Sequence, residues 1–429
     1  WLLLAIGLPL WVIGELSLEA GPLGINPPVV MGSLAAGLLI WRLLSARKTF
    51  LSWRPLLLPA LLLVATTTLA TCWGHPVYGP SHLGKLISAV ALFVVMSSSL
   101  TSPALMERFA KVFLVGAALV LGVLSAWYLL HFHYNALGIY LTEATTLGKN
   151  RAGYFVTLAL PLALAFFLHY PRKWQAGALL GIIAFATLYT LSRGAWVAVG
   201  FSLLCMLGFS SHRRQLAQAL ALIGLVVMPL LLLFPSQLGR LSERATTLVT
   251  LTETGVSTSI YQRATLTEAA FAAFAEAPLT GLGVGQIELI DPTGLGYRSS
   301  HDDYAQIAAE QGILGLAAFC SLMALVLVRS IKLILKAPRL QIPWIAEGFG
   351  AVGCALVVRH CFIYAYDTPA FWTMLALISA CSLLPEASKA KEKTSPKAAP
   401  ASAGTLYAYP ASEHYAREGA SVEAAICVQ

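Results

Sequence analysis

Residues 299–328 read SSHDDYAQIAAEQGILGLAAFCSLMALVLV, a short polar motif that leads into a long apolar run. A helix that crosses a bilayer needs roughly 20 predominantly apolar residues, because ~30 Å of hydrocarbon is crossed at ~1.5 Å per residue. Residues 304–328 meet that requirement. Similar runs recur along the 429 residues, of which 58% are hydrophobic and 11% charged. The sequence therefore predicts an all-α polytopic membrane protein, since helices satisfy their own backbone groups in lipid.

About twelve transmembrane helices are predicted from the length that a bilayer requires. They lie at about 1–18, 26–43, 56–73, 84–100, 109–131, 152–170, 174–191, 194–209, 216–234, 304–328, 343–363 and 368–384. If residue 1 is cytoplasmic, most of the 28 lysines and arginines fall in loops on that same side. Cytoplasmic loops carry an excess of these residues, so both termini are expected to be cytoplasmic.

One connection between the predicted spans is much longer than the others. Residues 235–303 would lie on the non-cytoplasmic face, and a loop of that length is expected to have structure and a function. Residues 238–251 space their leucines as in a helix that lies in the membrane interface. A second helix is predicted to begin near Ser257 or Ser259 and to end at Pro278.

The remaining composition narrows the function classes. The seven cysteines form no CxxC motif and no Cys/His metal-ligand spacing, which favours buried small hydrophobic residues. No Walker motif is present, and GLGVG at 281–285 does not follow a strand, so a flexible turn is expected rather than a phosphate loop. Residues 385–429, rich in Lys, Ala, Ser and Pro, are predicted to be a disordered cytoplasmic tail. Residues 1–384 then form one membrane domain that includes the loop.

Arginines dominate the basic residues predicted on the non-cytoplasmic face. Arg193 lies in a tight turn between two spans, Arg263 near the start of a loop helix, and Arg359 near the outer end of a span. Arginine binds phosphate oxygens through a planar fork of N–H donors, and a helix N-terminus also favours an anion. This pattern indicates a phosphate or pyrophosphate ligand; the alternative is that the arginines reach lipid headgroups. The same face holds Lys149, Arg151 and Arg298.

His301 stands in the SSHDD motif among these basic residues. In one interpretation the motif caps the following helix, with Asp302 and Asp303 accepting hydrogen bonds from its first amides. A cap does not require a histidine. An imidazole near arginines should have a lowered pKa, and a neutral imidazole at pH 7 can accept a proton. His301 is therefore a candidate general base whose tautomer the aspartates would fix. Paired carboxylates also leave a divalent metal ion as an alternative.

Three stretches of the sequence carry a family resemblance. They are SRGAWVAV at 192–199, YQRATLTEAAFAAFAEAPLTGLGVGQ at 261–286 and SSHDDYAQIAAEQGILGL at 299–316. The last two are similar to an R…P-L-x-G-x-G helix and to an H-N-x-Y…E-x-G-x-x-G start of the following span. With these motifs the sequence resembles the O-antigen ligase and polymerase family of bacterial envelopes. Asp302 stands where asparagine is commoner in that family.

The resemblance implies a GT-C-like fold and an inverting, metal-independent glycosyltransferase that needs no cofactor. Its donor would be a glycan on undecaprenyl pyrophosphate and its acceptor lipid A–core, at the periplasmic face of the bacterial inner membrane, among membrane lipids and without nucleic acid. Arg193 and Arg263 would grip the pyrophosphate and His301 would deprotonate the attacking hydroxyl. The substrate-binding residues would be Lys149, Arg151, Arg298, Asp302, Tyr304, Gln306 and Arg359.

Other functions stay open. An O-antigen polymerase would use the same donor with a second lipid-linked glycan, and a protein O-oligosaccharyltransferase would use a protein hydroxyl. A lipid-linked glycan flippase or transporter belongs to another class and would need charges along a path through the bilayer. The inner halves of the predicted spans hold few ionisable residues, which disfavours that path.

Overall fold

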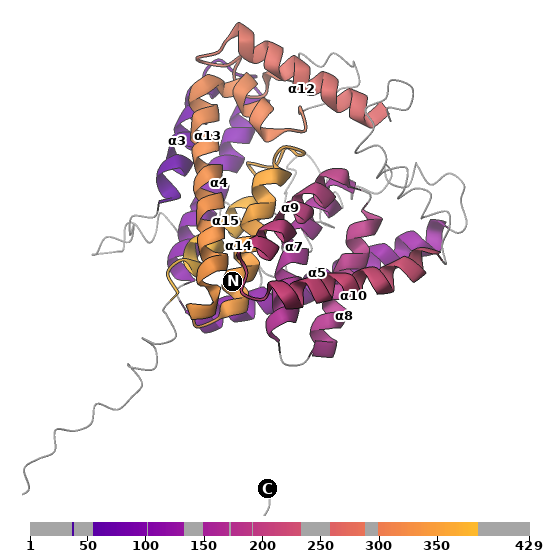
Figure 1. Ribbon diagram of the computed structural model, residues 1–429. Helices are drawn as coiled ribbons and strands as arrows, with labels where there is room; N and C mark the ends of the chain where they lie inside the picture. Colours follow the sequence, from indigo (N-terminus) through magenta and orange to yellow (C-terminus); the bar gives the residue numbers. More distant parts are fainter. Residues whose placement is uncertain are drawn as a thin grey trace, which may run out of the picture. The chain divides into compact units, whose positions relative to one another are not determined.

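The computed structural model describes residues 55–100, 102–132, 149–170, 173–190, 192–232, 258–287 and 299–384, together with residue 37. Within these residues every regular element is a helix (Figure 1). The helices are α3 (Leu57–Thr71), α4 (Tyr78–Ser99), α5 (Pro103–Phe132), α7 (Lys149–His169), α8 (Lys173–Tyr189), α9 (Arg193–Phe209), α10 (Arg213–Leu232), α12 (Thr258–Glu276), α13 (Asp303–Lys336), the 3₁₀ turn η2 (Ala337–Arg339), α14 (Pro343–Arg359) and α15 (Pro369–Cys381).

The predicted spans coincide with helices wherever the structure describes them. Spans 1–18 and 26–43 lie outside the described residues. Among the described residues, three helical stretches are long and apolar enough to cross a membrane, namely Tyr78–Ser99, Ala152–His169 and Asp303–Arg339. Shorter apolar helices are Leu57–Thr71, Trp174–Leu188, Arg193–Phe209 and Pro369–Cys381. These helices are those of a multi-pass membrane protein; the count of about twelve spans and the GT-C-like arrangement stay predictions.

Several helices extend beyond the predicted apolar runs, and α4 and α13 illustrate why. α4 begins at Tyr78 rather than near residue 84, because Pro80 falls in its first turn, where a missing N–H leaves no hydrogen bond unmade. α13 continues past residue 328 to Lys336, and Pro338 follows in the 3₁₀ turn. Hydropathy marks only the apolar part of a helix, and both ends here are polar.

In the long loop, α12 matches the predicted second helix, whereas 238–251 lies outside the described residues.

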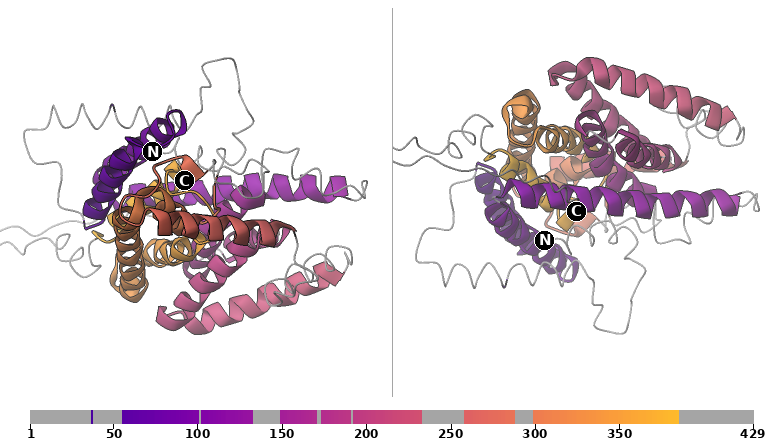
Figure 2. Two further views of the ribbon diagram at one scale, coloured as in Figure 1. Left: turned by 90° about the horizontal axis from the view of Figure 1, so that it is seen from above. Right: turned by 90° about the horizontal axis from the view of Figure 1, so that it is seen from below.

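α14 lies at the centre of the described helices and is buried along almost its whole length. It packs against α7, α9, α13 and α15, while α13 and α15 lie beside α3 and α4 (Figures 1 and 2). Close approach depends on glycine: a Cβ at Gly348 would lie 2.5 Å from Leu162 Cδ1, and one at Gly350 would lie 2.7 Å from the Ser330 carbonyl oxygen. Small residues let membrane helices approach in this way. The packing fixes both ends of α14 relative to α7 and α9.

α13 bends at Gly312, where φ is 66° and ψ is −160°. The GLGVG turn at 281–285 packs against this bend: Leu282 N donates to Ala309 O at 2.8 Å, and Gly283 N donates to Glu310 O at 3.0 Å. Gly285 N donates to Glu310 Oε1 at 3.0 Å. These amides are used within the protein rather than offered to a phosphate. The turn was predicted as flexible, and in the structure it is tied to the start of α13.

Candidate active site

The first turn of α13 is built from the SSHDD motif. Asp302 is the N-cap, and its Oδ1 accepts hydrogen bonds from Tyr304 N at 2.9 Å and from Ala305 N at 3.2 Å. Ser300 Oγ in turn donates to Asp302 O at 2.8 Å. The two bonds accepted by Asp302 satisfy amides that a helix start otherwise leaves without partners. Asp302 therefore has the capping role that one interpretation of the sequence predicted.

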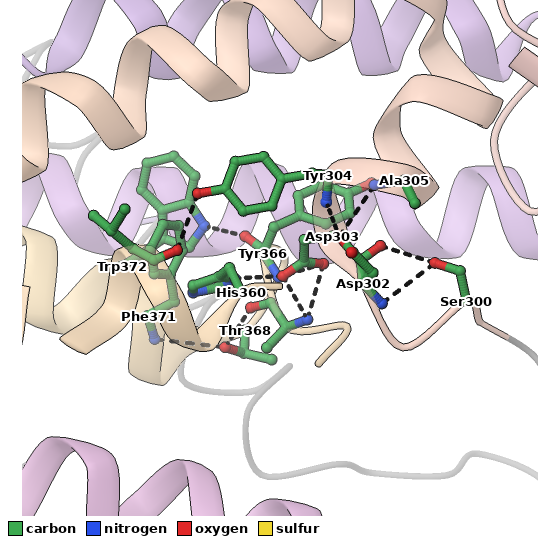
Figure 3. Close-up of polar contacts among 12 residues, drawn as sticks. Ser300, Asp302, Asp303, Tyr304, Ala305, His360, Tyr366, Thr368, Phe371 and Trp372 are labelled. Atoms are coloured by element: carbon green, nitrogen blue, oxygen red, sulfur yellow. Dashed lines mark hydrogen bonds and ion pairs between the residues drawn. The ribbon is translucent and has the colours of Figure 1, made fainter. Parts of the chain in front are cut away.

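Asp303 is buried and holds the segment that follows α14 (Figure 3). Its Oδ2 makes a very short contact with His360 Nδ1, and Ala365 N lies 3.1 Å from both carboxylate oxygens. Asp303 N donates to His360 O at 2.9 Å. The second aspartate of the motif thus orients His360 rather than the neighbouring His301. With Asp302 capping and Asp303 paired, both carboxylates have protein partners, which counts against a metal ion between them.

His301 adopts an unusual backbone conformation. Among the described residues it is the single non-glycine with positive φ, at 57°. Such a conformation costs a bulky side chain on the order of 1–3 kcal/mol and often marks a functional site. Burial, and next the charge of Arg263, lower the pKa of His301 from 6.5 to about 4. The imidazole is thus neutral at pH 7, as the sequence predicted, although burial contributes more than the arginine does.

The structure brings Arg263 close to His301 and links it to the ends of two further helices. Arg263 on α12 interacts electrostatically with both His301 and Arg359. Arg359 ends α14 and is fully buried, and a Cβ placed on Gly194 would lie 2.5 Å from its Nη1. Gly194 directly follows Arg193, the first residue of α9. We call Arg193, Arg263, His301 and Arg359 the arginine–histidine cluster. It joins the starts of α9 and α13, the side of α12 and the end of α14.

Two residues predicted to bind substrate have hydrogen-bond partners inside the protein. Tyr304 Oη donates to Val357 O at 3.0 Å. Gln306 is buried, with Oε1 accepting from Ser300 N at 2.8 Å and Nε2 donating to Glu310 Oε1 at 2.6 Å. Both side chains therefore tie the start of α13 to its surroundings. Arg298 and the side chains of Lys149 and Arg151 lie outside the described residues.

A polar network that the sequence analysis missed lies beside this region. His82 Nδ1 lies 3.0 Å from Asp367 Oδ2 and 2.9 Å from Tyr364 Oη. Gln311 Oε1 accepts from Thr66 Oγ1 at 3.0 Å and links α13 to α3. The sequence signal was the polar run YAYD at 364–367 between two apolar spans. The network adds contacts to the segment after Arg359, besides those that Asp303 makes.

A comparison with known protein families gives a match that includes the helices α9 and α12 and the start of α13. Residues 178–320 match the model of the family described as O-antigen ligase. The matched segment contains Arg193, Arg263 and His301, and Arg359 lies beyond it. No curated protein matches the chain. The match confirms the resemblance read from the motifs, and it supports a function of the O-antigen ligase or polymerase type.

Proposed function

We propose that this chain, with its O-antigen ligase domain, transfers a glycan from undecaprenyl pyrophosphate to lipid A–core at the periplasmic face of the bacterial inner membrane. The observation that carries the proposal is the arginine–histidine cluster, in which Arg263 of α12 interacts with the neutral imidazole of His301 and with Arg359 of α14. Arg193 precedes the glycine of α9 that packs against Arg359. A pyrophosphate donor needs cationic partners and a sugar hydroxyl needs a base, and the cluster contains both.

The arginines bind the donor through its pyrophosphate. Each guanidinium offers two N–H groups in the plane that suits two phosphate oxygens, and the pairing is strong because both partners are charged. Arg193 begins α9, so the positive end of that helix adds to the attraction for an anion. Arg359 is buried, and Arg263 interacts with it across the cluster. Mutual repulsion of these cations is relieved when the pyrophosphate binds, which favours an anion over a neutral sugar at this position.

His301 acts as the base in the transfer step. The acceptor hydroxyl oxygen forms a bond to the anomeric carbon while the bond from that carbon to the phosphate oxygen breaks, and the configuration inverts. The hydroxyl proton passes to the imidazole, and undecaprenyl pyrophosphate leaves with the bonding electrons. Arg193 and Arg263 stabilise the charge that develops on the leaving group. No nucleotide is consumed, because pyrophosphate is already a good leaving group.

Donor binding also tunes the base. A pKa of about 4 makes His301 a weak proton acceptor in the free protein. The bound pyrophosphate places negative charge beside Arg263, which cancels part of the repulsion that disfavours imidazolium. The pKa of His301 therefore rises when the donor is bound, towards the neutral range in which general bases are most effective. The histidine becomes a better base only after the donor is in place.

Product analysis tests this function directly. The full-length protein, reconstituted in lipid vesicles, is given a lipid-linked oligosaccharide together with lipid A–core, and the products are separated by mass. Glycan attached to lipid A–core supports the ligase. A lengthened lipid-linked glycan favours the polymerase, glycan on an added protein favours the protein transferase, and movement of donor across the vesicle without transfer favours the flippase. Any of these last three outcomes as the main activity refutes the proposal.

A further inference from the structure

A second group of titratable side chains lies at the other end of α14. Glu347 is in its first turns, His169 ends α7, and His212 immediately precedes α10. We call these three residues the His–Glu cluster. One ligand atom from each lies within 4.8 Å of the other two. Glu347 and Arg359 are separated by more than three helical turns, roughly 18 Å at ~1.5 Å per residue, so this cluster is separate from the candidate active site.

The distances within the His–Glu cluster suit a small ion between the three side chains. Glu347 Oε2 lies 2.6 Å from His169 Nε2 and 3.6 Å from His212 Nδ1. The two imidazole rings have centroids 4.3 Å apart. A tetrahedral zinc ion with bonds of ~2.0–2.1 Å places neighbouring ligand atoms roughly 3.3 Å apart. The His212 pair is near that value, and the His169 pair reaches it by opening roughly 0.7 Å.

The surroundings of Glu347 favour a bound cation. Its side chain is 2% exposed, and a buried carboxylate is costly unless a positive partner compensates it. Oε1 accepts a very short hydrogen bond from Ser210 Oγ, the kind of supporting contact that orients a metal-binding carboxylate. Ser210 Oγ also accepts from His212 N at 2.9 Å, which fixes the turn that carries the histidine.

Solvent reaches the His–Glu cluster at its two histidines. The side chains of His169 and His212 are 13% and 29% exposed, so an ion can enter without unfolding of the helices. Two imidazoles and one carboxylate are a ligand set that proteins use for zinc, with a fourth position left for water. Magnesium and calcium prefer sites made of oxygen ligands.

We propose that His169, His212 and Glu347 bind a divalent transition-metal ion, with Zn²⁺ as the best match. The ion fastens the end of α7 and the turn between α9 and α10 to the start of α14. Because α14 carries Arg359 at its far end, the ion holds the helix that positions one member of the arginine–histidine cluster. The ion takes no part in glycan transfer.

Metal titration of the purified full-length protein tests the site. The protein in detergent is stripped with a chelator and titrated with Co²⁺, whose visible absorption reports tetrahedral coordination, and then with Zn²⁺ by calorimetry. We expect one ion per chain and a rise in unfolding temperature. His212→Ala should weaken binding by more than ~100-fold, beyond what loss of a merely supporting residue costs. His75→Ala, which removes a partly buried histidine elsewhere, is the control and should bind like the wild type.

Two results would overturn the site. One is the absence of saturable Zn²⁺ or Co²⁺ binding by the wild type. The other is equal binding by His212→Ala and His75→Ala, which would leave only a hydrogen-bonded His–Glu group. Glu347→Gln is less decisive because removal of a buried charge can prevent folding. His212 is the more exposed of the two histidines, so its replacement keeps the test independent of folding.

Discussion

Replacement of Arg263 tests the proposed mechanism through two independent measurements. Arg263 interacts with both His301 and Arg359, so its loss should affect the leaving group and the base together. Removal of one donor to a developing oxyanion costs about 10²–10³-fold in kcat. We expect that loss for Arg263→Gln. Arg263→Lys keeps the charge without the planar fork and should lose at least ~10-fold, since one point charge replaces two parallel hydrogen bonds.

The second measurement is the pH dependence of transfer. The proton-accepting form of His301 is lost as the pH falls through its pKa, so kcat/KM of the wild type should fall only near pH 4. Arg263→Gln removes the smaller of two causes that lower this pKa. The acid limb of kcat/KM should therefore move to higher pH yet stay below 6.5, because burial persists. In the wild type, the acid limb of kcat should lie above that of kcat/KM, since bound pyrophosphate raises the pKa of His301.

The assay measures initial rates of glycan transfer to lipid A–core from about pH 3 to pH 8, a range that includes both the lowered pKa of about 4 and the ordinary pKa of 6.5. Arg214→Gln serves as the matched control, because Arg214 is an exposed arginine on α10 outside the cluster. A near-normal kcat in Arg263→Lys would show that the planar guanidinium of Arg263 is not needed to bind the pyrophosphate. An acid limb that stays in place in Arg263→Gln would show that His301 is not the titrating base, and the catalytic assignment would then be wrong.

Further replacements separate chemistry from positioning. His301→Ala should lower kcat by about 10²–10⁴-fold with little change in unfolding temperature, as measured in the same transfer assay. Asp303→Asn should lower the free energy of unfolding by about 3–5 kcal/mol in chemical denaturation, because it breaks a buried pair with His360. Gly194→Ala should reduce the rate of transfer by at least ~10-fold, because the added Cβ would displace the guanidinium of Arg359. Small displacements of a substrate-positioning group lower the rate strongly. Gly200→Ala, on the same helix with open space around it, should leave the rate unchanged.

Hydropathy and local chemistry predicted much of the fold and part of the site. The apolar runs located every described helix from α3 to α15 apart from α12, which its composition and the proline after it predicted. The cap at Asp302 followed from sequence, because it depends on neighbours within a few residues. The lowered pKa of His301 was predicted from nearby arginines, whereas burial is the larger cause in the structure. The ends of some helices were predicted wrongly. Residues 78–83 of α4 are an example, because their polar side chains lower the hydropathy below that of a membrane span.

The side-chain pairs that the sequence did not predict join residues distant in the chain. Asp303 pairs with His360 and Glu347 with His169 because α14 packs against both α13 and α7, and that packing depends on glycines that a hydropathy profile treats as neutral. From the sequence, Asp303 was predicted to have a role in the cap, and no role was predicted for Glu347. Buried Asp303, Glu347 and Arg359 lie where helix ends meet, so each end of α14 places charged groups that a membrane interior tolerates only with partners.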